Sequence, residues 1–446
     1  MNFIFSITFL VACSVSQVFG GFIKVDTLDK LNEALAKSGN RIQLARGKYD
    51  LGDISGGKKI LNFSGSNNSI DLRGTYINAT VGVVRQSYIV VSGNKNTITG
   101  GVIEDTYSNG VKKVVDFSAF NKDRKTQAYG LRGDAVMSIT GQHNTVKKLK
   151  LTVRGSWPYG YGSYYGIGAH NTFGLNKRCG ILINELGNRL DEVEVQMRAF
   201  GHGIYMQGNA DETVIENCVV EGVIRKTAEL YDEVDPEDLP QKTGHYFPNE
   251  KDYKMDSPGK YPIPKDSVHS LCEDGIRMYN ISGSVRVENC TVRKMRGGIR
   301  LYLGGPAVVK DCKVEFCEYT CYNLPKNGVV EDSEGDFSYG PLSDYRSNRS
   351  GTKVEWTVIR SPHAMGNHNL MDIKGNNHHV TLNRKPGATD RKEKRVIYVT
   401  GNGSTIINKT EYGVVLAKGT SGNKVTSYGP VTDNGKGNKV LKGRRR

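Results

Sequence analysis

The sequence contains no long apolar segment beyond its first twenty residues. Phe3–Val11 is apolar but too short to span a bilayer, and small residues follow it. This pattern predicts a signal peptide over residues 1–20 and no membrane span. A second processing route stays open, because Leu10–Cys13 is similar to a lipoprotein box that would lipidate Cys13. The lack of Lys and Arg before the apolar run favours simple secretion, to a periplasm or outside the cell.

Proline is scarce, with 13 residues against 53 glycines, and no Cys-x-x-Cys pair occurs. The missing pair argues against a structural zinc site. Nucleic-acid-binding motifs are also absent, although the formal net charge is +15. On an exported protein this charge indicates a polyanionic partner such as an acidic polysaccharide. Part of the charge lies in the tail Arg444–Arg446, which can equally be a solvated end.

What the sequence does contain is short runs of Val, Ile, Thr and Asn separated by Gly and Asn turns, which is typical of an all-β protein. The unit recurs along the chain at an irregular period of roughly twenty to twenty-five residues. Cys218, Cys290 and Cys312 occur in the repeated contexts Glu-Asn-Cys, Glu-Asn-Cys and Lys-Asp-Cys. We therefore expect these three thiols at one inward position of successive rungs, packed as small apolar groups.

The segment before the repeats predicts a capping element. Asp26 can cap a helix that carries Leu28, Leu31 and Leu35 on one face, and Arg41–Leu44 alternates as a strand. This order, followed by Gly47-Lys48-Tyr49, resembles the N-terminal cap of the pectate-lyase-like superfamily. The resemblance implies a right-handed parallel β-helix, with residues 21–446 as one domain whose first rung is covered by the cap.

The register of the predicted rungs follows from segments that align on one another. Residues 204, 276, 299 and 321 take the inward position, so their neighbours Tyr205, Arg277, Arg300 and Tyr322 are predicted to point outward as one column. Arg277 to Arg300 spans 23 residues and Arg300 to Tyr322 spans 22, each one rung. Tyr205 to Arg277 spans 72, which indicates an inserted loop over about residues 224–270.

Two adjacent arginines in one column repel each other unless an anion lies over them, so the column is the leading site. Carboxylates of the inserted loop are the alternative partners. Further groove residues are predicted from His202, which begins the Tyr205 strand, and from two excursions near residues 157–178. The substrate-binding set expected from these segments is Tyr161, Tyr164, Tyr165, Arg178, Arg198, Asp274 and Tyr322.

These side chains suit β-elimination on a uronic acid polymer. Arg277 and Arg300 would neutralise the C6 carboxylate, so that the C5 proton becomes removable. His202 and Tyr205 would share the acid and base roles, with Lys177 as a reserve base. In architecture the chain resembles the polysaccharide lyases with a parallel β-helix, which implies a secreted, monomeric lyase, with alginate as the first substrate to consider. The chain lacks the aspartate cluster of the pectate lyase calcium site, so we expect no cofactor, and Ca²⁺ binding stays open.

Two alternatives remain at the level of sequence. Gly201-His202-Gly203 is similar to the Gly-His-Gly of polygalacturonases, and a hydrolase could use Glu273 and Asp274 with Asp211 or Glu221. Full pairing of the arginines with protein carboxylates would favour this hydrolase. The other alternative is a non-catalytic glycan-binding surface protein, since a β-helix can also serve as a rigid scaffold.

Overall fold

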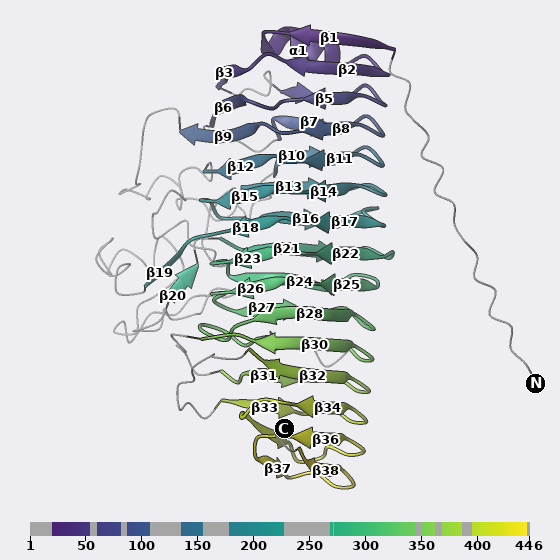
Figure 1. Cartoon of the computed structure of the whole chain (residues 1–446), viewed down its shortest axis with the longest axis vertical. Helices are drawn as coiled ribbons and strands as arrows, with labels where there is room; N and C mark the ends of the chain where they lie inside the picture. Colours follow the sequence, from purple (N-terminus) through teal and green to yellow (C-terminus); the bar gives the residue numbers. More distant parts are fainter. Residues whose placement is uncertain are drawn as a thin grey trace, which may run out of the picture.

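The computed structural model describes residues 20–53, 60–81, 87–107, 135–154, 178–226, 268–270, 272–344, 349–361, 368–385 and 395–443. Over these residues the chain winds into stacked coils whose strands pair in parallel with those of the next coil (Figure 1). Residues 1–19 of the predicted signal peptide lie outside the described residues. Among the residues that are described, no helix is long and apolar enough to cross a membrane.

A 13-stranded parallel sheet forms one side of the coil stack. It consists of β4 (Leu61–Asn62), β7 (Ile89–Val91), β10 (Ala135–Ile139), β13 (Cys179–Ile183), β16 (Ile204–Met206), β21 (Asp274–Tyr279), β24 (Gly297–Leu303), β27 (Thr320–Asn323), β29 (Ser343–Asp344), β31 (Met371–Ile373), β33 (Val396–Val399), β35 (Gly413–Leu416) and β37 (Val431–Asp433). Every coil from β4 onward thus contributes one short strand to this side.

The remaining sides belong to a 23-stranded sheet made of two arrays that merge at β28. The first array is β1 (Gly21–Val25), β2 (Asn40–Leu44), β5 (Ser69–Asp71), β8 (Thr97–Thr99), β11 (Thr145–Lys147), β14 (Arg189–Asp191), β17 (Thr213–Glu216), β22 (Val285–Glu288), β25 (Ala307–Lys310), β28 (Val329–Gly335), β30 (Lys353–Val358), β32 (His379–Arg384), β34 (Thr405–Asn408), β36 (Lys424–Ser427) and β38 (Lys439–Lys442). The second is β3 (Gly47–Asp53), β6 (Thr75–Val81), β9 (Val102–Tyr107), β12 (Lys150–Val153), β15 (Glu194–Met197), β18 (Val219–Glu221), β23 (Thr291–Arg293) and β26 (Lys313–Glu315).

The only antiparallel pair among the described strands is β19 (Ile224–Lys226) with β20 (Val268–Ser270). These strands begin and end the inserted segment that the 72-residue spacing predicts. The insertion therefore leaves the coil stack through a two-stranded ribbon, where the sequence suggested a loop without strands.

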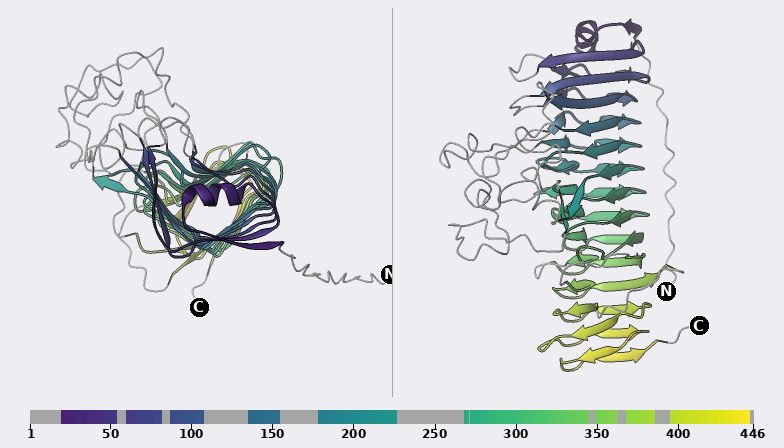
Figure 2. Two further views of the ribbon diagram at one scale, coloured as in Figure 1. Left: turned by 90° about the horizontal axis from the view of Figure 1, so that it is seen from above. Right: turned by 90° about the vertical axis from the view of Figure 1, so that its left-hand side faces the viewer.

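The single described helix, α1 (Leu28–Leu35), lies across the first coil, as the view along the stack shows (Figure 2). Leu31 and Leu35 are buried beneath it, which confirms the predicted capping element. The N-cap prediction was wrong by one residue, because the Thr27 side chain accepts the Lys30 amide hydrogen while Asp26 binds the Lys30 ammonium. The cap shields the apolar end of the coil from water.

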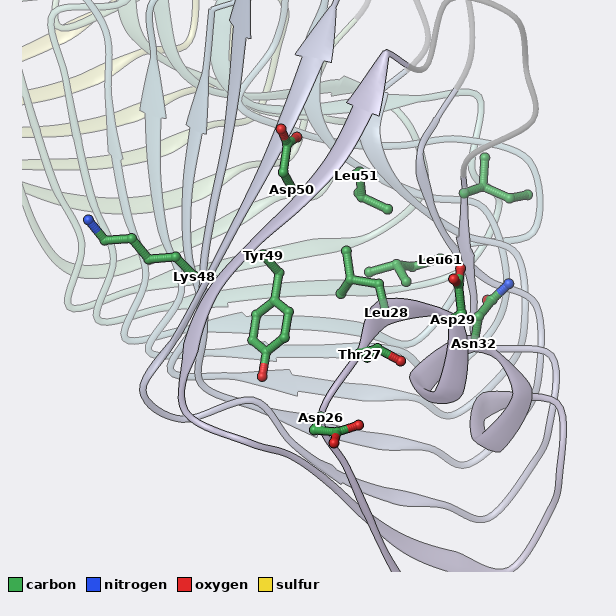
Figure 3. A pocket seen from close by; sticks show the side chains of 11 residues that line it. Asp26, Thr27, Leu28, Asp29, Asn32, Lys48, Tyr49, Asp50, Leu51 and Leu61 are labelled. Carbon is green, nitrogen blue, oxygen red and sulfur yellow. The ribbon is translucent and has the colours of Figure 1, made fainter.

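A pocket of about 560 Å³ opens between α1 and β3 (Figure 3). Asp26, Asp29 and Asp50 line it, but Asp26 is paired with Lys30 and the Asp50 carboxylate accepts the Gly52 amide hydrogen. At least two of its three carboxylates therefore serve the local structure of the cap.

Polar ladders run through the turns of the stack. In one ladder, each asparagine side-chain oxygen accepts the backbone amide hydrogen of the asparagine one coil earlier, at 2.9 Å. The ladder begins at Asn40 and continues through Asn68, Asn96, Asn144 and Asn188. Each such bond contributes about 1 kcal/mol net and gives these four backbone amides an acceptor. The recurring Gly and Asn turns of the sequence are thus structural.

The cysteine prediction is confirmed. Cys218, Cys290 and Cys312 are buried in the apolar core, and all seven cysteines of the described residues are free thiols. Burial raises the pKa of the Cys290 thiol, and its hydrogen bonds with the two neighbouring thiols raise it further. The Cys290 thiol therefore stays protonated, and the three cysteines pack as a column of small side chains.

One buried carboxyl group makes the fold sensitive to pH. Asp336 accepts hydrogen bonds from the Phe316 amide and the Ser338 hydroxyl, yet burial dominates and raises its pKa from 3.8 to about 6. The folded protein therefore binds this proton more tightly than the unfolded chain. Its contribution is most favourable below pH 4 and is lost as pH rises through about 6.

We predict that Asp336→Asn removes this loss. We compare the unfolding free energy of the native protein with that of the variant. From pH 4 to pH 7 the native value should fall by up to about 3 kcal/mol more than the variant value, since one pKa unit corresponds to about 1.4 kcal/mol. Denaturant unfolding of both proteins across this range measures the difference. A pH-independent difference between the two proteins would contradict the assignment.

Candidate active site

The predicted column of outward side chains exists on β16, β21 and β24. Tyr205 pairs in register with Arg277, and Arg277 pairs with Arg300. Ile204, Ile276 and Ile299, which precede them, are fully buried in the core. Alternation along these strands therefore places the tyrosine and both arginines side by side on the outer face of the 13-stranded sheet, midway along the stack (Figure 1).

The prediction for Tyr322 was wrong. It pairs with Ile299, so Asn323 follows Arg300 in the column. Tyr322 is 0 % exposed, packs against the Trp356 ring at 5.6 Å and donates its hydroxyl to the Glu334 carbonyl. One additional residue between Cys312 and Thr320 lengthens this rung, which the constant cysteine spacing did not reveal.

Asp274 holds the arginines together. Arg300 Nη1 donates to Asp274 Oδ1 at 2.9 Å, and Arg277 Nη1 lies 3.5 Å from Oδ2. Burial alone would raise the pKa of Asp274, but Arg300, Arg296 and Arg277 outweigh it and hold the pKa well below its usual range. The two column guanidiniums therefore share one permanent carboxylate, which reduces their repulsion without cancelling their charge.

This arrangement corrects two expectations. Asp274 is 1 % exposed and bound to arginines, so it organises the site and does not face a groove as a substrate contact. The anion that relieves the arginine column comes from β21 itself, where the sequence suggested the inserted loop. Arg296, whose Nη2 lies 3.3 Å from Glu273 Oε1, extends the same cluster.

Arg277 lies between two aromatic rings. Its guanidinium is 4.5 Å from the ring centroids of both Tyr279 and Tyr302, and Nη2 donates to the Tyr302 hydroxyl at 3.0 Å. Arg277 is 5 % exposed, and its Nε and Nη1 atoms have no hydrogen-bond acceptor among the described residues. An unsatisfied buried donor costs about 1–3 kcal/mol. An incoming carboxylate would supply the missing acceptors.

His202 and Tyr279 form a hydrogen-bonded pair. The Asp274 amide donates to His202 Nδ1 at 3.2 Å, so the proton of the neutral ring belongs on Nε2. Nε2 lies 2.8 Å from the Tyr279 hydroxyl and 3.3 Å from Glu273 Oε2. Burial raises the pKa of Tyr279, and Arg277 opposes this only in part. Tyr279 is therefore a neutral phenol at ordinary pH, held next to an imidazole.

A pocket of about 370 Å³ opens beside Tyr279. Its lining comes from the ends of successive strands of the 13-stranded sheet: Asn184, Gln207, Gly208, Tyr279 and Asn280. The Tyr205 ring is also near the imidazole, with the two ring centroids 5.8 Å apart. Tyr279 is thus the residue that connects the buried cluster with an open surface.

Sequence reasoning missed Tyr279, Tyr302 and Arg296. The signal was present for the tyrosines, because each stands two residues after a column arginine and alternation returns it to the same face. Arg296 precedes β24 in a turn, where no periodicity predicts direction. Its place in the site follows only from the coil that brings it to Glu273 and Asp274.

Two other predicted substrate contacts lie elsewhere. Arg178 is 0 % exposed, pairs with Asp105 at 3.4 Å and lies over the Tyr88 ring. Arg198 donates to the backbone carbonyls of Met197, Glu221 and Gly222. The fully buried Arg178 stabilises the coils, so its prediction as a substrate contact was wrong, whereas Arg198 is half-buried and its substrate contact stays a prediction.

The predicted residues Lys177, Tyr161, Tyr164 and Tyr165 lie outside the described residues. Within the described part of the chain, no group of three or more His, Cys, Asp or Glu side chains is arranged to hold a metal ion.

No protein-family model matches the chain, and no curated protein matches it. Among solved structures, an alginate lyase in complex with G6 is 11% identical and has a TM-score of 0.52, covering 94% of this chain and 86% of that chain. The catalytic domain of a GH87 alpha-1,3-glucanase with nigerose is 12% identical, with a TM-score of 0.44 and coverage of 96% and 66%. The chain thus spans just under two thirds of that domain. An endo-xylogalacturonan hydrolase from Aspergillus tubingensis is 11% identical, with a TM-score of 0.34 and coverage of 95% and 96%.

The likeness to the alginate lyase shows the fold. The chain is a right-handed parallel β-helix, as the resemblance of its N-terminal cap implies.

Proposed function

We propose that this protein is a secreted polysaccharide lyase, which cleaves a uronate-containing polysaccharide by β-elimination. The observation that carries the proposal is Arg277, a buried cation whose Nε and Nη1 lack acceptors within the described chain, in register with Arg300 and Tyr205. A uronate carboxylate matches it in charge and in hydrogen-bonding capacity. Alginate is the first substrate to test.

The first task of the site is to make the C5 proton acidic. The C6 carboxylate would accept hydrogen bonds from Arg277, while Arg300 adds a second positive charge next to it. Because Asp274 already fixes both guanidiniums, they need little reorganisation when the substrate binds. Negative charge that moves onto the carboxylate as C5 loses its proton is then stabilised by groups already in place.

The second task is to move two protons. A base removes the C5 proton, the C5–H electron pair forms the C4–C5 double bond, and the C4–O4 bond breaks. Tyr279 would donate its phenol proton to the departing O4, and the resulting phenolate would be stabilised by His202 Nε2–H and by Arg277. The base is Tyr205, next to Arg277 on the adjacent strand, or Lys177.

The hydrolase alternative gains little support from the geometry. A hydrolase needs a protonated carboxyl group as acid, but the pKa of Asp274 is lowered and Glu273 is buried between Arg296 and His202. Asp211 accepts a hydrogen bond from the Gly283 amide in a turn. Glu221 pairs with Arg293 and Lys294 on the 23-stranded sheet. Both carboxylates therefore stabilise the coils away from the column.

A panel of acidic polysaccharides tests the proposal. Alginate, pectate, ulvan and glycosaminoglycans are incubated with the protein, and both ultraviolet absorbance of unsaturated uronate and reducing ends are followed. The proposal expects both signals to rise together on one polymer. Reducing ends without absorbance would indicate hydrolysis, and the absence of both signals alongside retained binding would indicate a glycan-binding protein.

A further inference from the structure

The outer column continues beyond Arg300 toward the C-terminal end of the stack. Arg300 Nε donates to Asn323 Oδ1 at 2.8 Å, and the Asn323 amide donates to the Asp344 carbonyl. Asp344 pairs in register with Asp372 on the next strand. A hydrogen-bonded polar face thus leads away from the proposed reaction centre over several coils.

An exposed aromatic ring lies on this face. Tyr319 is 51 % exposed, and the Arg300 guanidinium lies 5.2 Å from its ring centroid. The other large apolar side chains exposed among the described residues lie in the first strand, β1, and the last, β38. Tyr319 is therefore an exposed aromatic on the flank of the stack, directly beside the arginine column.

A lysine ammonium lies on the same polar face, paired with Asp344. Lys374 follows β31, and its Nζ is 2.9 Å from Asp344 Oδ1 with its side chain 41% exposed. Burial lowers the pKa of Lys374, but Asp344, Asp372 and Tyr319 outweigh it, and the net shift is upward. Lys374 therefore stays protonated. Asp344 fixes its ammonium group, and part of the side chain remains exposed to solvent.

We propose that Tyr319 and Lys374 form a second sugar-binding position for a neighbouring uronate of the same polysaccharide chain. The apolar face of the sugar would pack on the Tyr319 ring, and its carboxylate would accept a hydrogen bond from Lys374. The inference rests on the proposed function and extends it. The groove then runs from Tyr279 past Arg300 toward the C-terminal coils, and it requires a substrate of several acidic sugars.

Steady-state kinetics on the cleaved polymer test this position. Tyr319→Ala and Lys374→Met should each raise KM about three- to tenfold and leave kcat nearly unchanged, because the groups bind substrate without taking part in the reaction. Tyr319→Phe keeps the ring and should restore the native KM. Lys385→Met is the matched control, since Lys385 is a half-exposed lysine paired with Glu334 at 3.0 Å on the 23-stranded sheet.

Affinity electrophoresis in gels that contain the same polysaccharide separates binding from catalysis. Cleavage with native KM values in both variants would overturn the second position and leave the proposed reaction intact. If the protein cleaves no polymer but loses retardation in Tyr319→Ala and Lys374→Met only, the position stands and the lyase proposal fails. Equal retardation of all variants would overturn the position in either case.

Discussion

Arg277→Ala is expected to lower kcat/KM on the acidic polysaccharide by about 10²–10³-fold or more, the loss typical when one preorganised charge-stabilising donor is removed. The reason is specific to this side chain, because Arg277 combines burial, two donors without acceptors in the described chain, and a position between two tyrosine rings. Arg277→Lys keeps the charge but not the planar guanidinium, so an intermediate loss is expected.

The measurement is kcat/KM on the cleaved polymer, with thermal unfolding as a check on folding. Asp274 keeps Arg300 and Arg296 as partners in the variant, so the fold should survive. Arg286→Ala is the control, because Arg286 is an exposed arginine paired with Glu288 on the 23-stranded sheet. A native kcat/KM in Arg277→Ala would remove Arg277 from the reaction.

The second large effect is expected for Tyr279→Phe. The ring would still lie over Arg277, but no hydroxyl would remain to protonate the departing O4, so kcat should fall by about 10²–10⁴-fold with little change in KM. Since the pKa of Tyr279 is raised, the phenol stays protonated above pH 10, and loss of activity on the alkaline side must come from another group.

Two further tyrosine variants locate the roles. Tyr76→Phe is the control, because Tyr76 lies on the 23-stranded sheet and donates its hydroxyl to Glu104. Tyr205→Phe tests the base, and a native kcat there would shift the role to Lys177. A Tyr279→Phe variant with native kcat would contradict the assignment of the acid, whatever Tyr205→Phe shows.

The architecture and the centre of the site were both predictable from sequence, for the same physical reason. Side chains alternate across a strand and coils repeat at a near-constant length, so spacing alone placed Tyr205, Arg277 and Arg300 in one column. The cap was also predictable, since Leu31 and Leu35 lie on one face of the helix and this apolar face must pack against an apolar surface.

The remainder depended on information that periodicity does not carry. One additional residue in a turn rotated Tyr322 into the core, although the neighbouring cysteines kept their spacing. Arg178 pairs with Asp105, which lies 73 residues earlier in the chain, and this buried pair stabilises the coils. The role of Asp274 required the positions of three arginines from β21, β24 and the turn before β24, which only the folded coils bring together.

The central claim is that the protein cuts its polysaccharide substrate by elimination at the C4–O4 bond. Cleavage in water enriched in heavy oxygen tests this claim most directly. The active polymer is digested, the products are reduced at once, and their masses are read. The account predicts products that carry an unsaturated uronate and no solvent oxygen. Saturated products that contain one solvent oxygen per cut would contradict elimination and transfer the reaction to a hydrolase.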